Sequence, residues 1–200
     1  MATGMSLFGK RVLVVGYGPV GKGIAERARA LGAIPYVAEL DPVRSIEARH
    51  HGCEVIDLDG GLARCHIVVT ATGREGVITR DRLSRLRKGA VLCNAGHSNR
   101  EIDIDWLYTQ PHQRMKAHVE RFDVEGTSFF LLGQGSLLNL AVETGLYGAD
   151  LWDHYTAVIL RGILWMFDGI PPEVKPGLQL YPATLEREIA QLSVRLHSEG

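Results

Sequence analysis

Residues 11–39 read RVLVVGYGPVGKGIAERARALGAIPYVAE, and this stretch decides the fold class. An apolar run of strand type is followed directly by three spaced glycines, Gly16, Gly18 and Gly21, and then by a helical pattern. In this context the first glycine permits a tight turn, the second lets a phosphate approach the backbone, and the third packs the helix against the strand. The stretch therefore predicts the first strand–turn–helix–strand unit of a dinucleotide-binding domain.

The helix that follows these glycines opens with Pro19 and Val20. Proline suits a first helical position, and the free amides and positive end of the helix form an anion site. Glu39 closes the second strand, where an acid accepts hydrogen bonds from both ribose hydroxyls of an adenosine and repels a 2′-phosphate. Glu39 therefore indicates NAD rather than NADP as the cofactor, and its neighbour Leu40 is also expected to contact the cofactor. Arg44 leaves the NADP alternative open, because a nearby arginine can accommodate that phosphate. We expect it instead to lie along the adenine or to face solvent.

Outward from this unit, apolar runs bounded by turn residues alternate with helical patterns. Alternation of this length implies parallel strands joined by right-handed crossovers, and a β-hairpin within residues 116–135 is expected at one side. The predicted fold is an α/β, Rossmann-type doubly wound parallel sheet with an added β-hairpin and C-terminal helices. The expected strands are 11–15, 34–39, 53–57, 66–72 and 90–95, and the expected helices between them are 19–32, 42–51 and 79–87.

After Gly145 the pattern changes to a strongly apolar helix over residues 151–167 and an amphipathic helix over 183–197. In the second half of the first helix, apolar side chains occupy nearly the whole circumference, whereas a surface helix shows one apolar stripe. We expect this surface to be covered by a second copy of the chain, in a homo-oligomer such as a dimer, or by a separate substrate-binding chain. The expected domains are an NAD-binding Rossmann domain over 1–148 and a helical segment for oligomerisation or partner contact over 149–200.

The composition excludes several classes of protein. The 200 residues carry a formal net charge of −1 and no long basic block, so neither nucleic acid nor a membrane is an expected partner. No apolar run reaches the length of a membrane span or a signal peptide. The 3 cysteines form no CxxC pair, which fits a reducing cytoplasm. No histidine has metal-ligand spacing with a cysteine or a carboxylate, so no metal is expected.

Five motifs follow one another in the order of a known family: GYGPVGKG (16–23), ELDPVRSIEA (39–48), VTATG (69–73), NAGHSNREID (94–103) and LLGQGSLLNLA (131–141). On these motifs, residues 9–145 resemble the NAD-binding domain of S-adenosylhomocysteine hydrolase, also called adenosylhomocysteinase. The likeness continues weakly through residues 181–190. The resemblance implies a tightly bound NAD that is reduced and reoxidised in each cycle, while the substrate's 3′-hydroxyl is oxidised, homocysteine is eliminated, water is added and the ketone is reduced again.

The resemblance also implies roles by position. The three glycines of the loop and Glu39 would hold the adenosine diphosphate portion of NAD. Polar residues at later strand ends would lie beside the cofactor, since the carboxyl ends of parallel strands face the ligand crevice and an asparagine can both donate to and accept from an amide. These residues are Thr70 and Thr72 next to the cofactor, Gly96 and His97 on the nicotinamide side, and Asn139 at the carboxamide.

The chain departs from the family pattern on the substrate side. The family's substrate domain, with its catalytic lysine and aspartates, is not found before the NAD-binding motifs. The family's Gly-His-Pro corresponds to Gly145-Leu146-Tyr147, and its acidic and basic pair before the asparagine corresponds to Gln134 and Ser136. The family's C-terminal tail, which reaches a neighbouring subunit's cofactor, is also missing. These departures argue against a complete hydrolase.

Three functions remain open at this point. The first is hydride transfer between NAD and a hydroxyl or keto group of an unidentified small-molecule substrate, by an oligomer or with a partner chain. The second is a separated NAD-binding domain of an S-adenosylhomocysteine hydrolase, inactive alone, and the third is a non-enzymatic NAD-binding module. Oxidation of an alcohol needs a base within hydrogen-bond reach of the hydroxyl, and the candidates are His97, His154 and Asp153.

Overall fold

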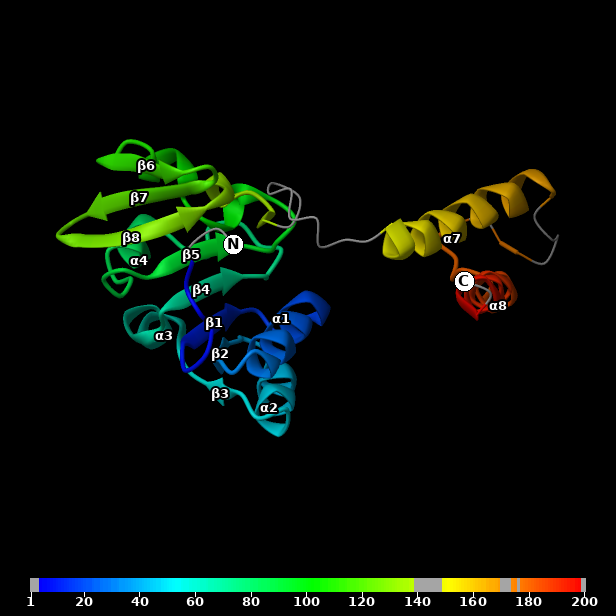
Figure 1. Cartoon of the computed structure of the whole chain (residues 1–200), viewed down its shortest axis with the longest axis horizontal. Coiled ribbons are helices and arrows are strands. Elements are labelled where there is room, and N and C mark those ends of the chain that lie inside the picture. The colour runs from blue at the N-terminus through cyan, green and yellow to red at the C-terminus, as the bar shows by residue number, and fades with distance from the viewer. Residues whose placement is uncertain (1–3, 139–148, 170–173, 176, 199–200) are drawn as a thin grey trace. The chain divides into compact units, whose positions relative to one another are not determined.

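The computed structural model describes residues 4–138, 149–169, 174–175 and 177–198, and it divides into two compact units, Met1–Glu143 and Thr144–Gly200 (Figure 1). The first unit holds strands β1 (Arg11–Val15), β2 (Ile34–Ala38), β3 (Glu54–Val55), β4 (Ile67–Thr70), β5 (Val91–Asn94), β6 (His112–Lys116), β7 (Val119–Val124) and β8 (Thr127–Leu132). They form an eight-stranded sheet in the order β3-β2-β1-β4-β5-β8-β7-β6. The first six strands in this order are parallel and the last two pair antiparallel. The predicted fold class is confirmed.

Helices of the first unit pack on both faces of this sheet. They are α1 (Pro19–Ala30), α2 (Pro42–His50), α3 (Leu58–Arg64), α4 (Arg80–Leu83) and α5 (Ile104–Leu107), with 3-10 turns η1 (Asn99–Glu101) and η2 (Gly133–Gly135). Val12 and Val14 of β1 pack in a buried cluster with alanines of α1 and α2. Leu13 and Val15 point to the opposite face and pack in a second cluster with leucines of α3, α4 and α5. Strand side chains alternate between faces, so one central strand contributes to both layers of the core.

Some elements differ from the expected boundaries. The helix expected over 79–87 ends at Leu83, where turn residues follow, and the strand expected over 53–57 is reduced to Glu54–Val55. Helix α3 was not predicted, because it is short and contains two adjacent glycines, which disfavour a helix. Its start is stabilised by Asp57, whose Oδ1 accepts a hydrogen bond from the Gly60 N–H at 2.7 Å. Strand β6 was also missed, because all five of its residues are exposed and show no alternation.

The hairpin predicted within residues 116–135 is formed by β7 and β8 and turns at Glu125-Gly126. Both turn residues have positive φ, 47° and 83°, which matches the twist of a two-residue hairpin connection. Strand β8 also pairs in parallel with β5, through Val91 opposite Phe130. The hairpin is therefore part of the main sheet, and the carboxyl end of β8 lies at the same edge as those of β1, β4 and β5.

The second unit is a pair of helices, α7 (Ala149–Phe167) and α8 (Ala183–Ser198). The Tyr181 hydroxyl donates a hydrogen bond to the Val158 carbonyl at 2.8 Å, and Arg161 pairs with Glu188 at 3.3 Å. Helix α8 covers only part of α7, because several apolar side chains of α7 are exposed, with an exposed fraction of up to 84 % at Phe167. These side chains are Tyr155, Ile159, Leu160, Ile163, Leu164, Met166 and Phe167. Within the described ranges, no helix has the length and hydropathy to cross a membrane.

Candidate functional site

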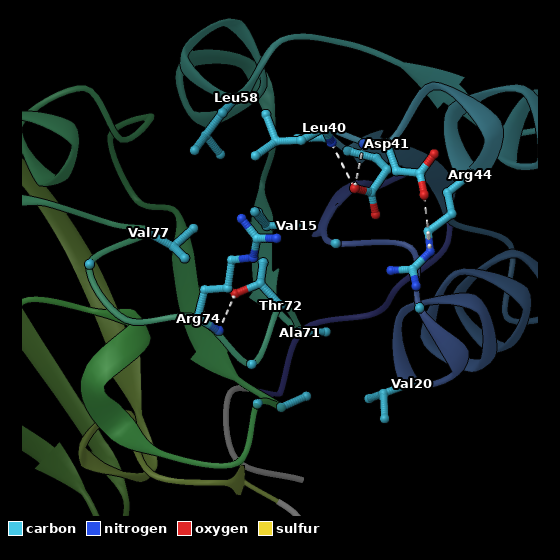
Figure 2. Close-up of a pocket in the computed structure, with 18 of the residues that line it drawn as sticks. Val15, Val20, Leu40, Asp41, Arg44, Leu58, Ala71, Thr72, Arg74 and Val77 are labelled. Carbon is cyan, nitrogen blue, oxygen red and sulfur yellow. Dashed lines mark hydrogen bonds and ion pairs between the residues drawn. The ribbon is translucent and has the colours of Figure 1, made fainter.

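A cavity of about 1080 Å³ opens at the carboxyl ends of the central strands (Figure 2). This volume is slightly above the usual range for small-molecule sites, about 300–1,000 Å³. The residues that follow β1, β2, β4 and β5 contribute to its walls, as the topology of a doubly wound sheet requires. Among them are Gly16, Gly18, Pro19, Val20, Glu39, Leu40, Arg44, Thr72, Gly96 and His97, all of which were predicted from the sequence.

The glycine loop has the geometry that its motif implies. Gly16 has a φ of 93°, and a Cβ there would lie 2.8 Å from the Ala71 carbonyl oxygen. A Cβ on Gly21 would overlap the Gly16 carbonyl oxygen, so Gly21 serves the packing of α1 rather than the lining of the cavity. At Gly18 the space is open, with Arg44 Nη1 the nearest atom at 3.8 Å. A phosphate can therefore approach the backbone at the start of α1, where helix N–H groups are free.

Tyr17 stands between the first two glycines, and its side chain is fully buried. Its hydroxyl lies 3.0 Å from His51 Nδ1, and burial, followed by the nearby Cys53, raises the pKa of Tyr17 to about 12. The phenol is thus a neutral part of the core beneath α2. Its backbone N–H points the other way and donates to Glu39 Oε2 at 2.6 Å, which ties the glycine loop to the end of β2.

Glu39 accepts two more backbone hydrogen bonds, from Leu40 N at 2.7 Å and Asp41 N at 3.0 Å, both on Oε1. Burial acts against ionisation of this carboxyl group. The N–H groups of Asp41, Tyr17 and Leu40 and the charge of Arg44 outweigh burial, and they lower the pKa of Glu39 below its ordinary value. The side chain is therefore a fixed anion at neutral pH. A carboxylate offers about four acceptor positions, so one remains for a ligand hydroxyl.

Arg44, on α2, lines the cavity. Its Nε is 3.8 Å from Asp41 Oδ2, and Figure 2 shows the two side chains facing each other. Asp41 also caps the start of α2, because its Oδ1 accepts a hydrogen bond from Val43 N at 2.8 Å, and α2 begins where the helix over 42–51 was predicted to begin. The arginine thus has a carboxylate partner within the protein.

The loop after β4 is held by a residue that the sequence did not reveal as part of the site, Glu101. This side chain is 1 % exposed. Its Oε2 accepts hydrogen bonds from the N–H and the hydroxyl of Thr72 at 3.1 and 2.9 Å, and its Oε1 accepts one from Gly73 N at 2.7 Å. A Cβ on Gly96 would overlap Glu101 Oε1. Glu101 therefore joins the loop after β4 to the loop after β5.

Asn94, at the end of β5, is a second buried connection that sequence reasoning missed. Its Oδ1 accepts from the Thr70 hydroxyl at 3.0 Å and from Gly96 N at 2.7 Å. Its Nδ2 donates to the carbonyl oxygens of Ser98 at 2.7 Å and Gly135 at 2.9 Å. Thr70 is itself fully buried and lies behind the cavity wall. Asn94 and Glu101 both lie within the motif at residues 94–103, but the motif does not reveal their partners, because only the fold brings those loops together.

The remaining predicted residues are placed as follows. His97 is exposed and lines the end of the cavity next to Gly96. Asn139 lies outside the described residues. His154 and Asp153 belong to α7 in the second unit, where His154 Nδ1 is 3.0 Å from the Ser193 hydroxyl and Asp153 is exposed. Among the described residues, no group of three or more histidine, cysteine, aspartate or glutamate side chains could hold a metal ion.

The geometry agrees with comparisons to known proteins. Residues 1–145 match the family model described as "S-adenosyl-L-homocysteine hydrolase, NAD binding domain". An adenosylhomocysteinase of Gloeobacter violaceus is 35 % identical over 196 residues, which cover 96 % of this chain and 45 % of that protein. The chain thus spans less than half the length of this curated relative.

Two solved structures are similar to about half of this chain. The pyruvate reductase of Chlamydomonas reinhardtii superposes with a TM-score of 0.47 at 25 % identity, over 54 % of this chain and 32 % of that one. The D-lactate dehydrogenase of Lactobacillus jensenii, solved with NAD+, gives 0.43 at 20 % identity, over 50 % and 31 %. The family match confirms the resemblance that the five motifs carried. NAD is the cofactor, and the chain belongs to the family of the S-adenosyl-L-homocysteine hydrolase NAD-binding domain.

Proposed function

We propose that this chain is the cofactor-holding part of an adenosylhomocysteinase-like enzyme that moves hydride between NAD and a hydroxyl or keto group of a substrate. The substrate would be held by another domain or chain. The observation that carries this proposal is the cavity itself. It joins an open glycine cradle and a fixed carboxylate, Glu39, at one end to the Gly96-His97 loop at the other.

The residues present fit NAD as the bound group. The pyrophosphate would lie over Gly16 and Gly18 at the start of α1, where a side chain is absent and N–H groups are free. The adenosine ribose would donate to Glu39, and the nicotinamide would extend toward Gly96 and His97. When bound, NAD supplies a hydride acceptor and donor. The protein orients it, and His97 is the titratable side chain among the described cavity residues that follow β5.

Selectivity for NAD over NADP follows from the two charged residues after β2. A 2′-phosphate would approach Glu39, which is held as an anion by three backbone N–H groups and cannot rotate away without losing them. The arginine that could compensate, Arg44, already faces Asp41. Both features favour a ribose with a free 2′-hydroxyl.

Partnering with other domains or chains is consistent with the second unit. Exposed leucine, isoleucine and phenylalanine side chains run along α7, and soluble monomers rarely leave large apolar patches uncovered. A homo-oligomer, with a dimer as its simplest form, or a separate substrate-binding chain would cover them. We place the protein in the cytoplasm, where reduced thiols such as buried Cys53, Cys65 and Cys93 persist.

A separated, inactive NAD-binding domain is the second candidate, because the chain covers 45 % of its curated relative. One experiment distinguishes the candidates. The purified chain is loaded with NAD and mixed with S-adenosylhomocysteine and with a panel of alcohols, and the release of products and the absorbance of NADH are followed. We expect no hydrolysis of S-adenosylhomocysteine by the chain alone. Turnover with an alcohol, alone or with a co-purified chain, supports hydride transfer. NAD binding without turnover in any complex would leave a non-enzymatic module instead.

A further inference from the structure

Arg74 is a cation inside the cavity that the family motifs do not explain. It follows β4, two positions after Thr72, and its side chain is exposed. Figure 2 shows the guanidinium rising from this loop into the cavity, toward the wall that carries Leu40 and Leu58. Arginines elsewhere on the cavity wall are paired, Arg44 with Asp41 and Arg82 with Asp59. Arg74 makes no ion pair with the residues that the structure describes.

The backbone that carries Arg74 is fixed. Its N–H donates to the Thr72 hydroxyl at 3.0 Å, and the Thr72 hydroxyl in turn donates to Glu101 at 2.9 Å. Gly73, between them, also donates its N–H to the buried Glu101 at 2.7 Å. These hydrogen bonds hold the backbone of Arg74 in place, so its side chain starts from a fixed point on the cavity wall.

The facing wall is apolar and unfilled. Leu40 is 88 % exposed, although it directly follows Glu39. It shares the cavity with Ile56, Leu58 and Val77, none of which is fully buried. A flat aromatic ring placed against Leu40 would cover this surface. The base of an adenosine whose ribose is held by Glu39 reaches this region, because the base is attached to that same ribose.

We propose that Arg74 stacks its guanidinium on the adenine ring of NAD, on the face opposite Leu40, and so closes the adenine subsite. The proposal rests on the proposed function, namely that NAD binds in this cavity. A planar guanidinium stacks on aromatic faces and is attracted to their π electrons. The alternative partner, the pyrophosphate, already has the glycine loop and the start of α1 to receive it. At the end of the cavity where the adenine would lie, Arg74 is the described cation that makes no ion pair.

The test compares three variants of the whole chain by titration calorimetry with NAD, with ADP-ribose and with nicotinamide mononucleotide, which lacks adenine. Arg74→Met removes the charge and the plane, Arg74→Lys keeps the charge, and Arg74→Tyr keeps a flat stacking surface. Arg49→Met, at an exposed position of α2 away from the cavity, is the matched control. We expect Arg74→Met to weaken NAD and ADP-ribose by about 2- to 30-fold, the range of a cation–π contact. Arg74→Tyr should restore most of that affinity.

The outcomes separate the possible failures. If Arg74→Lys keeps the affinity and Arg74→Tyr does not, the charge and not the flat surface of Arg74 contributes to binding, and the stacking proposal is wrong. Unchanged affinity in all three variants also overturns it, while NAD binding by the unmodified chain leaves the proposed function intact. Failure of the unmodified chain to bind NAD overturns both. Because the Arg74 side chain is exposed, the variants should fold, and equal melting temperatures for Arg74→Met and Arg49→Met check this.

Discussion

Replacement of Glu101 by glutamine should destabilise the cofactor-side loops although it changes only one atom. The carboxyl group receives three donors, Thr72 N, the Thr72 hydroxyl and Gly73 N. An amide has one acceptor oxygen and an NH2 group, so in either orientation one backbone N–H, of Thr72 or of Gly73, faces another donor. A buried group left without its partner costs about 1–3 kcal/mol. At ~2–4 °C per kcal/mol for a chain of this size, Glu101→Gln should lower the melting temperature by ~2–12 °C.

Thermal unfolding followed by circular dichroism measures this effect, with Glu75→Gln as the matched control. Glu75 lies on the same loop and pairs with Arg100 at 2.9 Å, but its side chain is 67 % exposed, so its loss should cost about 0–1 kcal/mol. Gly96→Ala supplies a second check, because its Cβ would meet the Glu101 carboxyl group. Glu101→Ala should relieve that overlap, so the double variant should be more stable than additivity predicts. Additive effects, or equal melting temperatures for Glu101→Gln and Glu75→Gln, would refute the assigned role.

Three further results are expected. Calorimetric titration should show tighter binding of NAD than of NADP. Glu39→Ala should weaken the binding of NAD by about 1–3 kcal/mol. Equal or tighter binding of NADP by the unmodified chain would contradict this preference and would indicate that Arg44 binds the 2′-phosphate. The pKa of Glu39 is lowered in the folded state, so its contribution to stability is complete above the unfolded-state pKa and is lost as pH falls through the folded-state pKa. The stability difference between the unmodified chain and Glu39→Gln should therefore shrink on acidification, and a difference that grows would contradict this assignment. Light scattering over a concentration series should give a mass above the 22.0 kDa of one chain, whereas a clean monomer at micromolar concentration would end the oligomer proposal.

Local patterns were sufficient to predict the part of the fold that depends on local chemistry. The glycines of the first loop, the proline starts of α1 and α2 and the buried strands of the parallel sheet each have a signal within a few residues. Helix α3 has no such signal, because Gly60 and Gly61 hide its helical pattern. No local pattern predicts that β8 lies between β5 and β7 in the sheet either. Strand order is determined by packing between distant segments.

The same division holds for the candidate site. Gly16, Gly18 and Glu39 are recognisable because one short segment carries both their spacing and their chemistry. Glu101 and Asn94 were missed, because each acts through partners on loops that are far away in sequence, such as Gly73 and Gly135. A glutamate in a polar stretch gives no indication that its side chain will be buried.

The two edge strands of the sheet, β3 and β6, affect how copies of the protein can associate. At one edge, β3 offers only two residues for pairing. At the other, β6 carries Arg114 and Lys116 on a fully exposed strand, with an irregularity in register between them. Short, charged and irregular edge strands discourage the edge-to-edge pairing of sheets that leads to aggregation. Both edges of the sheet therefore disfavour its growth into a larger sheet shared between copies, which favours helical or loop surfaces for a specific assembly.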